Sequence, residues 1–176
     1  RAMKGGVGTA SVKVGGVTVG ALIAVNSLGD VIDHDTGQPV AGARTEDGNA
    51  LLDTRRALLR GLSPKPLLAG TNTTIGVIAT DAVLTKVQAN RLATVAHDGL
   101  ARAINPVHTM SDGDTLFALA TGRVPLEGDA PGMTVLSTMA AEAVAIATLR
   151  AVHAARTVTV GELHIPCAAD LGKARG

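Results

Sequence analysis

Residues 73–104, TTIGVIATDAVLTKVQANRLATVAHDGLARAI, hold the pattern of a strand followed by the pattern of a helix. Apolar and β-branched residues from Ile75 to Thr80 predict a buried strand. Thr85 and Gln88 form a capping box, so a helix is predicted from about Lys86 to Ile104. Its apolar positions recur at helical spacing on one face: Leu92, Ala96, Leu100, Ala103 and Ile104. A strand that leads into a long one-sided helix indicates a layered α/β or α+β fold.

Patterns on either side extend this layered arrangement. Strands are predicted at 10–14 and 17–25, and the second is apolar on both faces, so both faces should be covered. The other predicted elements are a small surface hairpin at 30–43, a short helix at 51–62, a strand at 116–121 and a second long helix at 134–152. That last helix carries only Glu142 and Arg150 as charges and should be buried on several sides. Ser-Pro-Lys-Pro at 63–66 should end the short helix, and this stretch is predicted to be the most mobile linker.

The composition narrows the functional classes. The chain has 176 residues, of which 46% are hydrophobic, and this length suits one compact domain. Its 16 Lys and Arg residues balance 15 Asp and Glu residues, and it has one Phe and no Trp or Tyr. A nucleic-acid partner is therefore not expected, because the chain has neither a basic stripe nor an aromatic stacking platform. Apolar runs such as 19–25 and 75–79 are strand-sized, so no membrane partner is expected either.

Cysteine and motif usage indicate a protein without a cofactor in a reducing compartment. The single cysteine, Cys167, excludes an internal disulfide and predicts a cytoplasmic location. No cofactor or metal is expected, because the glycine-rich stretch at 4–9 lacks the rest of a phosphate loop and His34 lacks a second ligand cluster. The chain begins with Arg1 and not with Met, so we expect the sequence to start inside a longer protein.

Asn72, Thr73 and Thr74 stand immediately before the predicted strand at 75–80. A Thr hydroxyl can attack the carbonyl carbon of the preceding residue, which converts that peptide bond into an ester that water cleaves. Cleavage would leave Thr73 at a new N-terminus, where its own α-amine can act as a base. Taken alone, the tripeptide is more typical of a structural turn before a strand. Its third interpretation, an N-glycosylation sequon, requires a secreted protein, and nothing else in the sequence supports secretion.

Two acidic side chains and one side-chain amide are further candidates for catalytic roles. Asp112 and Asp114 flank Gly113, so their side chains should point to the same side of an extended segment. Held close together, such carboxylates can share a proton and act as a relay for a hydroxyl nucleophile. Asn26, which follows a predicted strand, could donate a hydrogen bond to an oxyanion. Taken singly, Asp-Gly and Asn are commoner as turn residues, and the scattered histidines are interpreted as packing or surface residues.

Six stretches together carry a resemblance to a known family. They are KGGVGTAS (4–11), VGALIAVN (19–26), NTTIGVIATDA (72–82), LTKVQANRLATVAHDGLARAI (84–104), PVHT (106–109) and DGDTLFALATG (112–122). In combination they resemble the L-aminopeptidase/D-esterase family, which includes β-peptidyl aminopeptidases and endo-type nylon-oligomer hydrolases. The segment IPCAADL near the C-terminus is similar to the tail of this family.

The resemblance implies an α+β fold, an αββα four-layer sandwich similar to that of N-terminal nucleophile hydrolases, of which this chain would hold the C-terminal part. It implies self-cleavage between Asn72 and Thr73, with 1–72 as the end of an α subunit and 73–176 as a β subunit within one domain. The implied partners are a small amide or peptide substrate, the α and β fragments themselves, and further copies in a homotetramer of αβ units.

The resemblance also assigns roles to residues. Thr73 would be the nucleophile, Asn26 the oxyanion donor and Thr74 a second polar group. Asp112 and Asp114 match the acidic pair of the nylon-hydrolase branch, whereas the aminopeptidase branch has a Ser at the first position. The family takes a Tyr and a Lys from an upstream region; this chain has no Tyr, and its Lys4 lies slightly past the expected position.

Several functional readings remain open at this point. The substrate class could be short peptides, β-amino acid amides, D-amino esters or ω-amino acid oligomers. One alternative is an acetyl-transferring relative of the ornithine acetyltransferase type, although the Ala-Thr-Met-Leu signature of that group is absent. Another is a non-catalytic module that keeps the fold.

Overall fold

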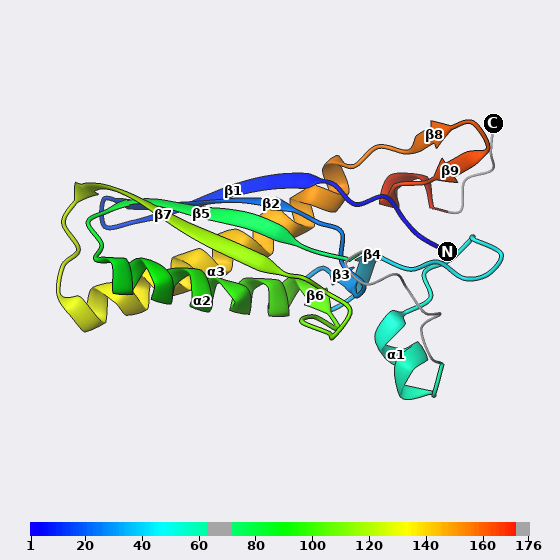
Figure 1. The fold of residues 1–176 in the computed structure, drawn as a ribbon, viewed down its shortest axis with the longest axis horizontal. Coiled ribbons are helices and arrows are strands. Elements are labelled where there is room, and N and C mark those ends of the chain that lie inside the picture. Colours follow the sequence, from blue (N-terminus) through cyan, green and yellow to red (C-terminus); the bar gives the residue numbers. More distant parts are fainter. Residues whose placement is uncertain (63–71, 172–176) are drawn as a thin grey trace.

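A computed structural model describes residues 1–62 and 72–171, and its centre is one four-stranded sheet (Figure 1). The strand order is β1-β2-β5-β7. Its strands are β1 (Val7–Val14), β2 (Val17–Ala24), β5 (Ile75–Ala82) and β7 (Thr115–Val124). β1, β2 and β5 pair antiparallel, whereas β7 runs parallel to β5. All four strands were predicted, and the linker predicted at 63–66 lies outside the described residues.

Two long helices, α2 (Lys86–Ala103) and α3 (Asp129–Ala154), complete the main layers. The predicted capping box is confirmed, because the Thr85 side chain accepts the Gln88 N–H at 3.2 Å while Gln88 Oε1 accepts the Thr85 N–H at 2.8 Å. Helix α3 begins five residues earlier than predicted (129 instead of 134). Pro131 does not prevent this start, since a proline in the first helical turn loses no intrahelical hydrogen bond.

Both helices pack against the same face of the sheet and against each other (Figure 1). α3 covers β1 and β2, and α2 covers β7. The largest fully buried apolar side chains of β2, β5, α2 and α3 are Val19, Ile23, Ile78, Leu92, Leu100, Leu136 and Val144. The backbones approach closely, since a Cβ added at Gly8 of β1 would lie 2.1 Å from the carbonyl oxygen of Ala147. The core therefore forms between one helix layer and one sheet layer.

Helix α3 is long and apolar enough to cross a membrane, although the sequence patterns predicted no segment of that length. In the structure, 61% of its most apolar window is buried inside the protein. This composition matches the prediction that the helix is covered on several sides. The helix packs against β1, β2 and α2.

The opposite face of the sheet is not covered by any part of the chain that the structure describes. Leu22, Val77, Phe117 and Leu119 are between 39% and 61% exposed there. The prediction that the strand at 17–25 is covered on both faces is therefore wrong for the described residues, because α2 and α3 lie on one side. The α+β class is confirmed, and the described residues supply one sheet layer and one helix layer of a four-layer sandwich.

Smaller elements lie beyond one end of the main sheet. A three-stranded sheet joins β4 (Pro39–Ala41), β3 (Asp30–Ile32) and β6 (Ile104–Asn105). The predicted hairpin corresponds to β3 and β4, and the predicted short helix is α1 (Thr54–Leu59). The hairpin of β8 (Val158–Val160) and β9 (Leu163–Ile165), followed by the short helix η1 (Ala168–Asp170), was not predicted. Because β3 pairs antiparallel with β6, the loop between β2 and β3 lies beside the loop that follows β6.

Candidate active site

The register of the main sheet brings three predicted segments to one edge. Ile75, the first residue of β5, pairs with Ala24 at the end of β2 and with Thr115 at the start of β7. Asn26, Thr73 and the acidic turn at 112–114 therefore meet where these strands begin or end. The meeting is direct, since the Thr73 N–H donates to the Asn26 carbonyl oxygen at 2.7 Å.

Thr73 lies beside the peptide bond that precedes it. Its Oγ1 donates to the Asn72 carbonyl oxygen at 2.5 Å, and the Gly113 N–H donates to the same oxygen at 3.1 Å. A Cβ at position 113 would come within 3.0 Å of Thr73 Oγ1, so glycine leaves room beside the hydroxyl. The hydroxyl and a backbone N–H therefore both reach the carbonyl group whose bond is predicted to break.

The two carboxylates of the acidic turn are held by separate donors. Asp112 accepts the Leu28 N–H at 3.1 Å through Oδ1 and the Thr109 hydroxyl at 2.7 Å through Oδ2. Asp114, with a side chain only 3% exposed, accepts the Thr74 N–H at 2.8 Å through Oδ1. Its Oδ2 lies 3.0 Å from His108 Nδ1. Each acid is thus oriented from two sides, and Asp114 is bonded to the residue next to Thr73.

Thr74 and Asn26 contribute backbone groups to this arrangement. The Thr74 side chain is fully buried, and its Oγ1 has no hydrogen-bond partner among the described residues. Its N–H binds Asp114, and its carbonyl oxygen accepts the Thr115 N–H at 3.0 Å. Asn26 accepts the Thr73 N–H with its carbonyl oxygen. A role for the Asn26 side chain at an oxyanion stays a prediction.

His108 and Thr109 belong to the cluster, and residue-level reasoning missed both. The interpretation of His108 as a packing or surface residue is incomplete, because its ring nitrogen contacts Asp114, one of the predicted site residues. The ring also lies against His97, with centroids 4.9 Å apart. Burial, followed by the nearby His108, lowers the pKa of His97 below its ordinary value. The closeness of His108 and Thr109 to the acidic turn in the sequence could have indicated both residues, because PVHT (106–109) ends three residues before that turn.

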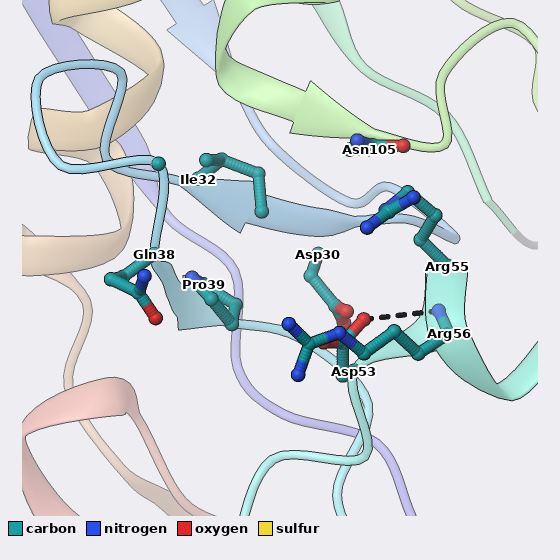
Figure 2. A pocket seen from close by; sticks show the side chains of 9 residues that line it. Asp30, Ile32, Gln38, Pro39, Asp53, Arg55, Arg56 and Asn105 are labelled. Atoms are coloured by element: carbon teal, nitrogen blue, oxygen red, sulfur yellow. Dashed lines mark hydrogen bonds and ion pairs between the residues drawn. The ribbon is translucent and has the colours of Figure 1, made fainter.

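A separate pocket of about 330 Å³ lies between β3, β6 and α1 (Figure 2). Asp30, only 1% exposed, accepts the Thr54 N–H at 2.5 Å, the Thr54 hydroxyl at 2.8 Å and the Ala43 N–H at 3.1 Å. Burial raises the pKa of Asp30, and these hydrogen bonds oppose the rise. Arg56 forms an ion pair with Asp53 at 3.2 Å at the same pocket. None of the predicted site residues lines this pocket.

The candidate site shows no metal-binding arrangement. Within residues 1–62 and 72–171, no group of three or more His, Cys, Asp and Glu side chains is arranged to hold a metal ion. Cys167 is a buried free thiol in the C-terminal segment; the Thr157 hydroxyl lies 3.6 Å from its sulfur. The groups that the described residues bring together at the site are the Thr73 hydroxyl, the two carboxylates, the His108 imidazole and backbone amides.

Comparison with known proteins identifies the family. Residues 1–165 match the model of peptidase family S58. The chain belongs to this family. This result confirms the resemblance to aminopeptidases and nylon-oligomer hydrolases, because named relatives of both kinds are found.

Relatives by sequence include an uncharacterised aminopeptidase of Mycobacterium tuberculosis, 44% identical over 93% of this chain and 49% of its own length. A 6-aminohexanoate-oligomer endohydrolase of Paenarthrobacter ureafaciens is 33% identical over 69% of this chain and 34% of its own. Among solved structures, the L-aminopeptidase D-Ala-esterase/amidase of Ochrobactrum anthropi, described as a variant of the Ntn hydrolase fold, has a TM-score of 0.65. Its sequence is 27% identical to this one, and the match covers 94% of this chain and 45% of the Ochrobactrum chain. Where nearly the whole chain aligns with a mycobacterial relative, it covers only about half of that relative's length.

Proposed function

We propose that the protein is a self-processing amide hydrolase whose nucleophile is Thr73. The observation that carries the proposal is the 2.5 Å contact between Thr73 Oγ1 and the Asn72 carbonyl oxygen. Membership of a peptidase family supports amide hydrolysis, as do relatives named as an aminopeptidase and an oligomer endohydrolase. These names belong to the relatives, so the activity is transferred to this chain as a hypothesis.

Self-cleavage would use the groups around the Asn72 carbonyl. Thr73 Oγ1 attacks the carbonyl carbon, a C–O bond forms, and the C–N bond of the Asn72–Thr73 peptide breaks. The hydroxyl proton moves to the departing nitrogen, which becomes the α-amine of Thr73. The Gly113 N–H already donates to the carbonyl oxygen and can stabilise the negative charge that develops there. Water then hydrolyses the ester, leaving an Asn72 carboxylate and a free Thr73 hydroxyl.

Turnover would repeat this chemistry on an external amide. The Thr73 hydroxyl attacks the substrate carbonyl, and the freed α-amine, with an ordinary pKa of about 7.7–8.0, accepts the hydroxyl proton. That proton goes to the leaving amine, and water hydrolyses the acyl-enzyme. In this scheme Asp112 and Asp114 serve as the proton relay and Asn26 as an oxyanion donor. Thr74 is proposed to act through its backbone N–H.

The finer features of the function stay proposals. We propose short peptides, amino acid amides or esters, or ω-amino acid oligomers as the substrate class. The Asp at position 112 favours the nylon-oligomer branch, as does the Paenarthrobacter relative. We also propose that the α and β fragments remain associated, that αβ units form a homotetramer and that the protein is cytoplasmic.

Intact mass spectrometry of the full-length protein tests the central proposal. The wild type and Thr73→Ser should each yield a fragment that starts at position 73, because both keep a hydroxyl nucleophile. Thr73→Ala should remain a single chain and should hydrolyse no amide or ester substrate. Cleavage of the Thr73→Ala protein at the same bond would contradict the proposal. An intact wild-type protein would favour a non-catalytic module.

A further inference from the structure

We propose that His108 is a positioning residue that orients Asp114 against the nucleophile segment. This inference rests on the proposed function and deepens it. His108 touches neither the scissile carbonyl nor Thr73 in the contacts described above. It would act through the carboxylate that binds the peptide N–H immediately after Thr73.

The geometry forms a continuous chain of contacts. His108 Nδ1 lies 3.0 Å from Asp114 Oδ2, and Asp114 Oδ1 accepts the Thr74 N–H at 2.8 Å. Asp114 therefore bridges the imidazole and the peptide group that follows the nucleophile. If the ring contact is lost, the carboxylate keeps only one of these two donors and can rotate. Thr73 then loses a fixed anchor on its C-terminal side.

Burial makes this bridge important. The Asp114 side chain is only 3% exposed, whereas the His108 side chain is 40% exposed. A carboxylate removed from water needs hydrogen-bond donors to remain charged, and donors to a charged acceptor form the stronger hydrogen bonds. With its proton on Nδ1, His108 supplies such a donor, and its half-exposed ring connects the acid to the protein surface.

The backbone at His108 supports a dedicated role. Its φ angle is 54°, in the left-handed region that residues other than glycine rarely occupy. Such conformations persist where the surrounding structure imposes them, and they cluster at functional sites. The next residue, Thr109, donates its hydroxyl to Asp112 at 2.7 Å. Two consecutive residues thus each hold one member of the acidic pair.

The test compares His108→Ala with His108→Asn in the full-length, processed protein. His108→Ala should lower kcat by about 10²-fold with little change in KM, because a misplaced catalytic group slows chemistry more than it weakens binding. His108→Asn keeps a side-chain N–H donor and should recover most of this loss. His153→Asn, at an exposed histidine near the end of α3, is the matched control and should keep the wild-type kcat.

A readout independent of turnover follows the hydrogen bond itself. In proton NMR of the inactive Thr73→Ala protein, the His108 Nδ1–H should give a slowly exchanging downfield signal that His108→Asn removes. This measurement also tests the hydrogen bond between His108 and Asp114 if His108→Ala fails to fold.

The outcomes separate this inference from the proposed function. Wild-type kcat in His108→Ala, equal losses in both His108 variants, or absence of the Nδ1–H signal would each overturn the role of His108. If any of these three contradicting results is found while Thr73→Ala is inactive, only the inference about His108 fails. If Thr73→Ala keeps full activity, the proposed function fails, and with it any catalytic role for this bridge.

Discussion

Asp30 and Asp114 both have carboxylates with little exposure to solvent, and both accept backbone N–H groups, yet their other surroundings differ. The donors to Asp30 are the Ala43 N–H and the N–H and hydroxyl of Thr54, which do not titrate near neutral pH and which connect β3 to the segment between β4 and α1. The donors to Asp114 are a peptide N–H beside the candidate nucleophile and a partly exposed imidazole. Burial alone therefore does not distinguish a structural acid from a candidate catalytic one, and the two acids differ in the donors that hold them.

Replacement of Asp114 should have the largest effect on activity. Asp114→Asn should lower kcat by about 10²- to 10⁴-fold, the usual contribution of a general acid or base, and should cost less stability than Asp30→Ala, because the amide oxygen can still accept the Thr74 N–H. Steady-state kinetics and urea denaturation of the same preparations measure both quantities. Asp98→Asn, at an exposed position on α2, serves as the control and should match the wild type in both. A wild-type kcat in Asp114→Asn would contradict a catalytic role for Asp114 and leave it a structural acid like Asp30.

Replacement of Asp30 should show the opposite pattern. Asp30→Ala leaves three donors without their acceptor and should reduce the free energy of unfolding by roughly 2–4 kcal/mol. The folded fraction should keep its kcat, since Asp30 contacts none of the candidate site residues in the hydrogen bonds described. Urea unfolding monitored by circular dichroism measures the loss. Asp35→Ala, whose side chain is 88% exposed, should change the free energy of unfolding by less than about 0.5 kcal/mol. Equal stability of the two variants would contradict the structural role of Asp30.

A smaller effect is expected when only one donor to Asp30 is removed. Thr54→Val deletes the hydroxyl that donates at 2.8 Å and keeps the backbone N–H. The expected destabilisation is about 1.5–3 kcal/mol, the usual value for a hydrogen bond to a charged group, and it should not add to that of Asp30→Ala. A double-mutant cycle in urea measures the coupling. Full additivity would mean that the two residues act independently.

The smallest effect concerns pH and His97, beside Asp114. Burial lowers the pKa of His97, so below pH 6.5 the unfolded chain takes up a proton more readily than the folded chain. The stabilisation from a neutral His97 is therefore complete above pH 6.5 and is lost as the pH falls through the lowered folded value. In His97→Gln, the free energy of unfolding should decline less between pH 6.5 and acidic pH than in the wild type. Parallel pH profiles for the two proteins would contradict this expectation.

Part of the molecule could be predicted from the sequence, and the missed parts have physical reasons. Apolar alternation or short apolar runs located the four strands of the main sheet, one-sided apolar spacing located α2, and the near absence of charges located α3. Taken singly, the acidic turn and the Asn-Thr-Thr stretch were more typical of turns, and only the family resemblance favoured them as site residues. Their meeting at one sheet edge depends on the register of β5 with β2 and β7, which is a long-range property.

The missed features rest on contacts without a local pattern. His108 is a lone histidine, and its role depends on a backbone conformation that residue type does not reveal. Asp30 binds Thr54 across 24 positions, within a polar stretch that was interpreted as surface. The strands β8 and β9 have three residues each, too few for alternation to stand out. The open face of the sheet was missed because apolar composition does not tell which side a helix covers.

The central position of β5 has a consequence for what a cut before Thr73 would do. One neighbour, β2, precedes that bond in the chain, and the other, β7, follows it. Both fragments would thus contribute strands to one continuous sheet, and α3 from the second fragment would still lie across β1 and β2 from the first. Separating the pieces would require unfolding the core. The cut protein should therefore migrate as one particle in gel filtration and show two bands only after denaturation.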